Sequence, residues 1–234
     1  MIIRDHGASY AFIHNPRTSG SSITNFLLEY CGGKRYSVKS EIEKQYNVHR
    51  VYASGPEKIK HYYKFGFVRN PFSRELSLYK LLMKNNSFTF KEWIISRFSD
   101  STNKNYESIL LYYKLPQFGY FCDINGELDV NVFRYEERDT ALKIIGDNIK
   151  VNMSNIGRFR PSKNSPRFDI GDYRNEYDYE MVSLIEEAYR VDLDNFGYTF
   201  EGFKPPEKRT FKFNGAVELY ISNYETGERF NKYK

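Results

Sequence analysis

The sequence is short of cysteine and histidine and has no long apolar run. Its two cysteines, Cys31 and Cys122, stand far apart, and neither they nor the four histidines have the spacing of a metal site. We therefore expect no bound metal. No apolar stretch is long enough for a signal peptide or a membrane span, so we expect a cytoplasmic protein that does not attach to a membrane.

Neither positive nor negative charge is concentrated in one part of the sequence. The formal net charge of +5 is modest and is spread over segments of mixed sign, which suits an anionic ligand but does not predict nucleic-acid binding. Aromatic residues are abundant, with 21 tyrosines and 19 phenylalanines among 234 residues. This supply of apolar side chains excludes wholesale disorder, and the length suits one domain with a substantial core.

A first stretch, residues 9–28, has the sequence SYAFIHNPRTSGSSITNFLL. Alternating apolar residues at 10–13 predict a short strand, small residues at 15–22 predict a loop, and the apolar residues that follow have helical spacing. A strand, loop and helix in this order direct free backbone N–H groups at an anion. Arg17 adds a positive charge, and Gly20 lets the backbone approach a ligand closely. We interpret this loop as a site for a phosphate or a sulfate.

A purely structural interpretation of the same loop stays open. Ser21 or Ser22 could be the N-cap of the helix and do nothing more. The loop is not a Walker A motif, because no Gly-Lys-Ser/Thr follows the second cluster of small residues.

A second stretch, residues 64–79, has the sequence KFGFVRNPFSRELSLY. It predicts a buried strand followed by a helix, with Pro71 in the first turn of that helix. Arg69 at the end of the strand and Ser77 two turns along the helix could bind one anion together.

The two stretches resemble the sulfotransferase family. IHNPRTSGSS is similar to that family's phosphosulfate loop, and FGFVRNPFSRELSLY is similar to the element that holds the 3′-phosphate of its cofactor. The segments FRYEE at 133–137, VNMSNIGR at 151–158 and DLDNFGY at 192–198 resemble later blocks of the carbohydrate sulfotransferases of the heparan and chondroitin type.

The resemblance implies transfer of a sulfuryl group from 3′-phosphoadenosine 5′-phosphosulfate (PAPS) to an acceptor hydroxyl, with a carbohydrate as the expected acceptor and 3′-phosphoadenosine 5′-phosphate (PAP) as the product. It implies that Arg69 and Ser77 bind the 3′-phosphate and that no metal is needed. The 5′-phosphosulfate would be held by Arg17, Thr18, Ser19, Gly20, Ser21 and Ser22. Arg17 would lie beside the bridging oxygen, where many carbohydrate sulfotransferases have lysine. Arginine can stabilise charge there but cannot give up a proton.

The acceptor hydroxyl also needs a general base. His49 is our candidate, because related enzymes place a catalytic histidine at a similar distance before the residue that matches Arg69. Carboxylates at Glu41, Glu43 and Glu57 are the reserve candidates. We expect His14 to pack against the loop or steady it.

A basic loop follows Asn152 and Ser154 and contains Arg158. It could be a solvated loop, a lid over the cofactor or a contact for an anionic glycan. Because the family's Asn-x-Ser block coincides with residues 152–154, we favour the lid and assign Arg158 to the cofactor.

We predict an α/β fold in which a single P-loop-like domain has a central, mostly parallel sheet flanked by helices, plus a C-terminal β-hairpin. Residues 1–203 would form the sulfotransferase-like catalytic domain and residues 204–234 the hairpin extension. Further helices are expected at 87–98, 103–115, 136–145 and 177–189, and two short strands around an Asn-Gly turn at 120–135. The absence of an anchor, which the Golgi relatives have, favours a bacterial or viral setting.

Two other functions remain possible from the sequence. A nucleotide kinase with a degenerate P-loop would share the strand–loop–helix site, but it should also have a Walker lysine and a metal-binding aspartate. A non-catalytic module that binds PAP, PAPS or a sulfated glycan would keep Arg69 and Ser77 but would lack a base.

Overall fold

The computed structural model describes residues 1–35, 57–83, 88–99, 116–122, 127–153, 156 and 170–204. These residues fall into two compact units, which we describe separately. The first unit comprises the described residues within 1–68 and 117–156, and the second comprises those within 69–116 and 170–204. Six α-helices are present in the described part of the chain, and none of its helices is long and apolar enough to cross a membrane.

The first unit is built on a five-stranded sheet with the order β3-β1-β2-β4-β5. The strands are β1 (Ile2–Arg4), β2 (Tyr10–Ile13), β3 (Lys34–Arg35), β4 (Tyr63–Val68) and β5 (Asn131–Arg134). β2 pairs with β4, and β4 with β5, in parallel, whereas β1 is antiparallel to both of its neighbours. Four of the five strands therefore run in one direction, and the predicted α/β fold with a mostly parallel sheet is confirmed.

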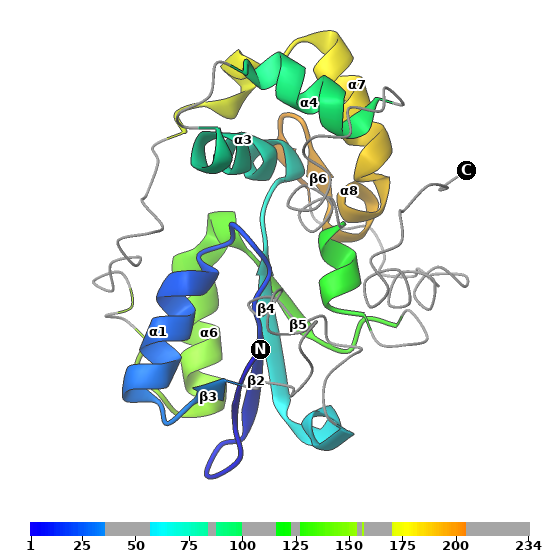
Figure 1. Ribbon diagram of the computed structural model, residues 1–234. Helices are drawn as coiled ribbons and strands as arrows, with labels where there is room; N and C mark the ends of the chain where they lie inside the picture. The colour runs from blue at the N-terminus through cyan, green and yellow to red at the C-terminus, as the bar shows by residue number, and fades with distance from the viewer. Residues whose placement is uncertain are drawn as a thin grey trace, which may run out of the picture. The chain divides into compact units, whose positions relative to one another are not determined.

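Two helices cover one face of this sheet, α1 (Gly20–Tyr30) and α6 (Arg138–Ile149) (Figure 1). Phe65 and Phe67 of β4 belong to the same buried cluster as apolar residues of both helices. Because successive residues of a strand point to opposite faces, Gly66 points away from these helices. A Cβ atom on Gly66 would overlap the ring of Phe121, so this aromatic residue packs directly on the other face. Three short 3₁₀ helices complete the unit: η2 (Glu57–His61), η4 (Gln117–Tyr120) and η5 (Tyr135–Glu137).

The second unit is helical apart from a two-stranded hairpin. Its elements are α3 (Pro71–Leu82), α4 (Phe90–Phe98), the 3₁₀ helix η7 (Tyr173–Glu176), α7 (Tyr179–Ala188), α8 (Arg190–Phe196), β6 (Tyr198–Thr199) and β7 (Gly202–Phe203).

A buried carboxylate, that of Glu75 on α3, is the centre of a polar network in this unit. It pairs with Arg97 Nε at 3.1 Å and accepts hydrogen bonds from Trp93 Nε1 at 3.3 Å and Tyr189 Oη at 2.6 Å. Buried charges need such partners, so this network fixes how α3, α4 and the end of α7 pack.

Several predicted elements differ from the structure at their ends. The helix expected from residue 87 begins at Phe90, because Thr89 and Glu92 form a capping box. The first of the two strands expected within 120–135 is reduced to one bridge between Cys122 and Leu128. Helix α8 and the β6–β7 hairpin were not predicted.

Other predictions lie outside the described residues. They are the helix at 103–115, the Asn-Gly turn at 125–126 and the C-terminal hairpin after Lys204. The division into a catalytic domain at 1–203 and an extension at 204–234 stays a prediction.

Candidate anion-binding sites

The loop between β2 and α1 has an unusual backbone. Arg17 and Ser19 have φ values of 66° and 68°, whereas Thr18 between them is not among the residues with positive φ. Non-glycine residues in the left-handed region are uncommon and carry strain, which tends to persist at functional sites. Backbone that alternates between the two regions turns successive N–H groups toward one side and forms a concave site for an anion. The loop that the sequence assigned to an anion therefore has a suitable backbone.

Buried hydrogen bonds hold the beginning of this loop. Thr18 Oγ1 donates to the carbonyl oxygen of Asn15 at 2.8 Å. The fully buried Asn15 side chain donates from Nδ2 to the carbonyl oxygen of Phe67 and to Gln117 Oε1, both at 2.9 Å. The loop is thereby tied to the carboxyl end of the neighbouring strand β4 and to η4. The Thr18 hydroxyl proton is used within the loop, so the donor that Thr18 can offer to a ligand is its backbone N–H.

Gly20, the first residue of α1, lies directly against His14. A Cβ atom on Gly20 would overlap the His14 imidazole, so only glycine fits at this position. His14 is buried and stacks on Phe12, with ring centroids 5.8 Å apart, and its Nδ1 lies 3.4 Å from Thr24 Oγ1. The expected role of His14 as a packing residue beside the loop agrees with these contacts.

Helix α1 begins before Ser21 and Ser22, which were the candidates for its N-cap. Ser19 is the N-cap and its side chain makes no capping hydrogen bond, while Ser21 and Ser22 already belong to the helix. The interpretation of Ser21 or Ser22 as the N-cap is therefore wrong. The first N–H groups of a helix have no acceptor within it, and the positive end of the helix dipole lies there. Gly20, Ser21 and Ser22 thus present N–H groups where an anion is favoured.

In the second unit, Arg69 is held by Ser73, for which we predicted no role. Arg69 Nε donates to Ser73 Oγ at 2.8 Å, and both side chains are buried. Ser77 is one turn further along α3 and is also buried. The spacing of four residues between Arg69 and Ser73 was a signal for this contact, because the first turn of the helix follows immediately.

The beginning of α3 agrees with the sequence. Pro71 is in the first turn, and the Asn70 side chain accepts a hydrogen bond from the Phe72 N–H at 3.1 Å as the N-cap. Two other assigned residues, His49 and Arg158, lie outside the described residues.

Comparison with known proteins identifies the class of protein. A sequence model of the sulfotransferase family matches residues 2–139, more than half of the chain, and the chain belongs to this family. The matched region includes both stretches with anion-site character, and the resemblance to carbohydrate sulfotransferases is consistent with it. No curated protein and no solved structure gives a significant match. Family membership supports sulfuryl transfer as the general activity, and it does not favour the kinase or the non-catalytic binding module.

Proposed function

We propose that the protein transfers a sulfuryl group from PAPS to a hydroxyl group of an acceptor, and that the acceptor is a carbohydrate. The observation that supports this most is the loop before α1, in which left-handed Arg17 and Ser19 precede a helix N-terminus without a side-chain cap. The resemblance of the later blocks to carbohydrate sulfotransferases supports the acceptor class.

The chemistry of the loop suits a phosphosulfate group. Residues 14–22 contain no carboxylate, and among their donors are backbone N–H groups, serine hydroxyls and one guanidinium. Charged and neutral donors of this kind bind tetrahedral anions without a metal. PAPS, when bound, supplies the sulfuryl group and the leaving phosphate. In the proposal the hydroxyls of Ser19, Ser21 and Ser22 and the N–H groups of Thr18 and Gly20 hold its 5′ end.

Each charged residue then has a separate task. Arg17 stabilises the negative charge that collects on the leaving oxygen, which is the kind of interaction that lowers an activation barrier most. Arg69 and Ser77 bind the 3′-phosphate, and Arg158 also contacts the cofactor. His49 accepts the proton of the acceptor hydroxyl as the general base.

Nucleotide binding tests the donor assignment. PAP and adenosine 5′-phosphate differ only in the 3′-phosphate, so the ratio of their dissociation constants reports recognition of that group. Arg69→Ala should weaken PAP binding by about 2 kcal/mol, roughly thirtyfold, because charged hydrogen bonds are lost. Binding of adenosine 5′-phosphate should barely change.

Isothermal titration calorimetry gives both dissociation constants, and Arg190→Ala is the matched control. Arg190 is an exposed arginine of the same unit, at the start of α8. A wild-type protein with no preference for PAP, or equal losses for both nucleotides in Arg69→Ala, would contradict the assignment.

A further inference from the structure

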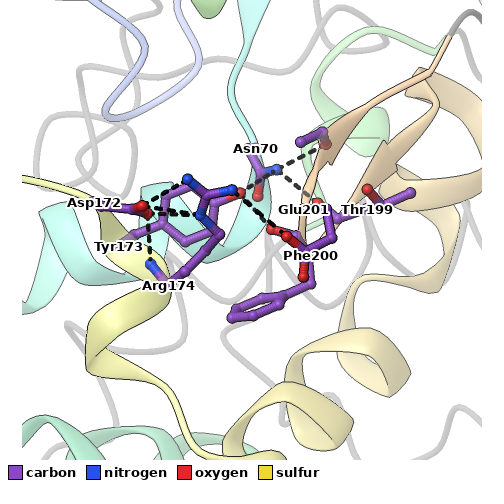
Figure 2. A network of polar contacts seen from close by, with 8 residues as sticks. Asn70, Asp172, Tyr173, Arg174, Thr199, Phe200 and Glu201 are labelled. Carbon is purple, nitrogen blue, oxygen red and sulfur yellow. Dashed lines mark hydrogen bonds and ion pairs between the residues drawn. The ribbon is translucent and has the colours of Figure 1, made fainter.

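The buried side chain of Asn70 makes more contacts than helix capping requires (Figure 2). Its Oδ1 is used by the cap, through the Phe72 N–H. Its Nδ2 donates to the carbonyl oxygens of Thr199 and Gly202, at 2.9 and 3.1 Å, and lies 3.2 Å from Tyr173 Oη. An N-cap needs only an acceptor, and aspartate or serine would serve equally well. Only the amide of asparagine adds donors on the opposite side of the same side chain.

The group that these donors hold is the β6–β7 hairpin. Thr199 and Gly202 are paired across its two-residue turn, and Gly202 has a φ of 149°, which favours glycine. Tyr173 Oη donates to the carbonyl oxygen of Phe200 in the turn at 2.6 Å. The hairpin turn is therefore fastened by Asn70 and Tyr173, as Figure 2 shows. An exposed ion pair between Arg174 and Glu201, at 3.5 Å, also joins the turn to η7.

The Phe200 side chain adds apolar contacts to this attachment. Its ring packs on that of Phe72, with centroids 5.1 Å apart, so the turn also rests on the first turn of α3. The hydrogen bonds and the ring contact act on the same short segment of backbone.

This segment carries Arg69. Asn70 follows Arg69 directly, and Pro71 restricts Asn70 to an extended conformation, with an observed ψ of 122°. The guanidinium is held at the other end, where Nε donates to Ser73. The direction in which Arg69 projects thus depends on the peptide that Asn70 fixes and on Ser73.

We propose that Asn70 is a positioning residue for recognition of the 3′-phosphate: its Nδ2 hydrogen bonds to the β6–β7 hairpin hold the backbone from which Arg69 reaches that group. This inference rests on the proposed function, because it assumes that Arg69 binds the 3′-phosphate of the nucleotide. Asn70 itself need not touch the ligand.

The substitution Asn70→Asp separates capping from positioning. Aspartate keeps the acceptor for the Phe72 N–H, and its charge is favourable at a helix N-terminus. It removes both N–H donors and places a carboxylate oxygen opposite the carbonyls of Thr199 and Gly202. We expect PAP to bind about tenfold more weakly, and adenosine 5′-phosphate to bind within about twofold of wild type.

A second, milder variant keeps the test informative if Asn70→Asp does not fold. Tyr173→Phe removes only the hydroxyl, which contacts Asn70 Nδ2 and the Phe200 carbonyl, and keeps the ring. It should weaken PAP binding by about threefold, again without a matching loss for adenosine 5′-phosphate. Arg190→Ala, which changes an exposed arginine at the start of α8, is the control and should leave both affinities unchanged.

The titrations distinguish failure of this inference from failure of the proposed function. If Arg69→Ala abolishes the preference for PAP while the folded Asn70→Asp and Tyr173→Phe variants keep it, the positioning role of Asn70 is wrong. Equal losses for the two nucleotides in those variants would also overturn it, since they would indicate a general structural effect. If wild type shows no preference for PAP, or Arg69→Ala keeps the preference, the assignment of Arg69 fails instead.

Discussion

Replacing Ser19 with glycine should stabilise the protein while weakening its binding of nucleotide. Ser19 has φ 68° and ψ 11°, and its side chain makes no capping hydrogen bond to α1. Its hydroxyl therefore contributes little to folding at this position, while its Cβ atom makes the left-handed conformation unfavourable. Glycine adopts the same conformation without that penalty.

The expected magnitude follows from two opposing effects. Relief of the left-handed conformation is worth about 1–2 kcal/mol. Glycine also gives the unfolded chain more freedom, which costs about 0.4–1 kcal/mol. The net gain should be about 0.8 kcal/mol, or roughly 2 °C in Tm for a chain of this length.

Thermal unfolding followed by circular dichroism, with PAP titration of the same samples, tests this reasoning. Ser19→Ala is the matched control, because it removes the hydroxyl but keeps the Cβ atom. The glycine variant should unfold at a higher temperature than both wild type and the alanine variant, and both variants should bind PAP more weakly. A glycine variant no more stable than the alanine variant would refute the assignment of strain to Ser19.

Two further predictions concern stability. The Tyr10 hydroxyl is fully buried and has no hydrogen-bond partner among the described residues. Tyr10→Phe should therefore raise the free energy of unfolding, measured in urea, by about 1 kcal/mol. A decrease of about 1 kcal/mol in that free energy would contradict this. Asp178, the N-cap of α7, has its pKa lowered by hydrogen bonds from Lys91 and from the Met181 N–H. A lowered pKa in the folded state stabilises it above the unfolded pKa, and the contribution is lost as the pH falls through the folded pKa. Asp178→Asn, which can still cap, should therefore lower Tm at neutral pH, and the difference should disappear as the pH falls below about 4; a difference independent of pH would contradict this.

The parts of the fold that the sequence predicted well carry local signals. The strand at 10–13 and the helix beginning at Pro71 show apolar periodicity, and the loop after the strand is marked by Pro16 and Gly20. The Thr89–Glu92 capping box is a local signal of the same kind, and it marks the start of α4.

The missed elements have weak local signals. β6 and β7 are two residues each, and their turn, at Phe200 and Glu201, is not an Asn-Gly or Asp-Gly pair. α8 has seven residues and follows α7 after a single residue, Tyr189, so its periodicity is too short to detect.

In the candidate site, too, residues with a local sequence signal were predicted and residues without one were missed. Arg17 and Arg69 were identified because they belong to recognisable motifs. Asn15 and Asn70, which fix the backbone near these two arginines, were not identified, because their hydrogen-bond partners are distant in sequence. Gln117 lies 102 residues after Asn15, and Thr199 and Gly202 lie 129 and 132 residues after Asn70. A single sequence has no signal that pairs such positions.

Sulfate transfer itself tests the central claim most directly. The protein is incubated with sulfur-labelled PAPS and a panel of carbohydrates, and labelled product is counted for wild type, Arg17→Ala, Arg17→Lys and His49→Ala. We predict labelled product from wild type with at least one carbohydrate and substantial activity in Arg17→Lys. Turnover should fall by about a hundredfold in Arg17→Ala and in His49→Ala, with PAP affinity within a few-fold of wild type. A wild-type protein that binds PAPS but labels no acceptor, or an Arg17→Ala variant that turns over like wild type, would contradict the account.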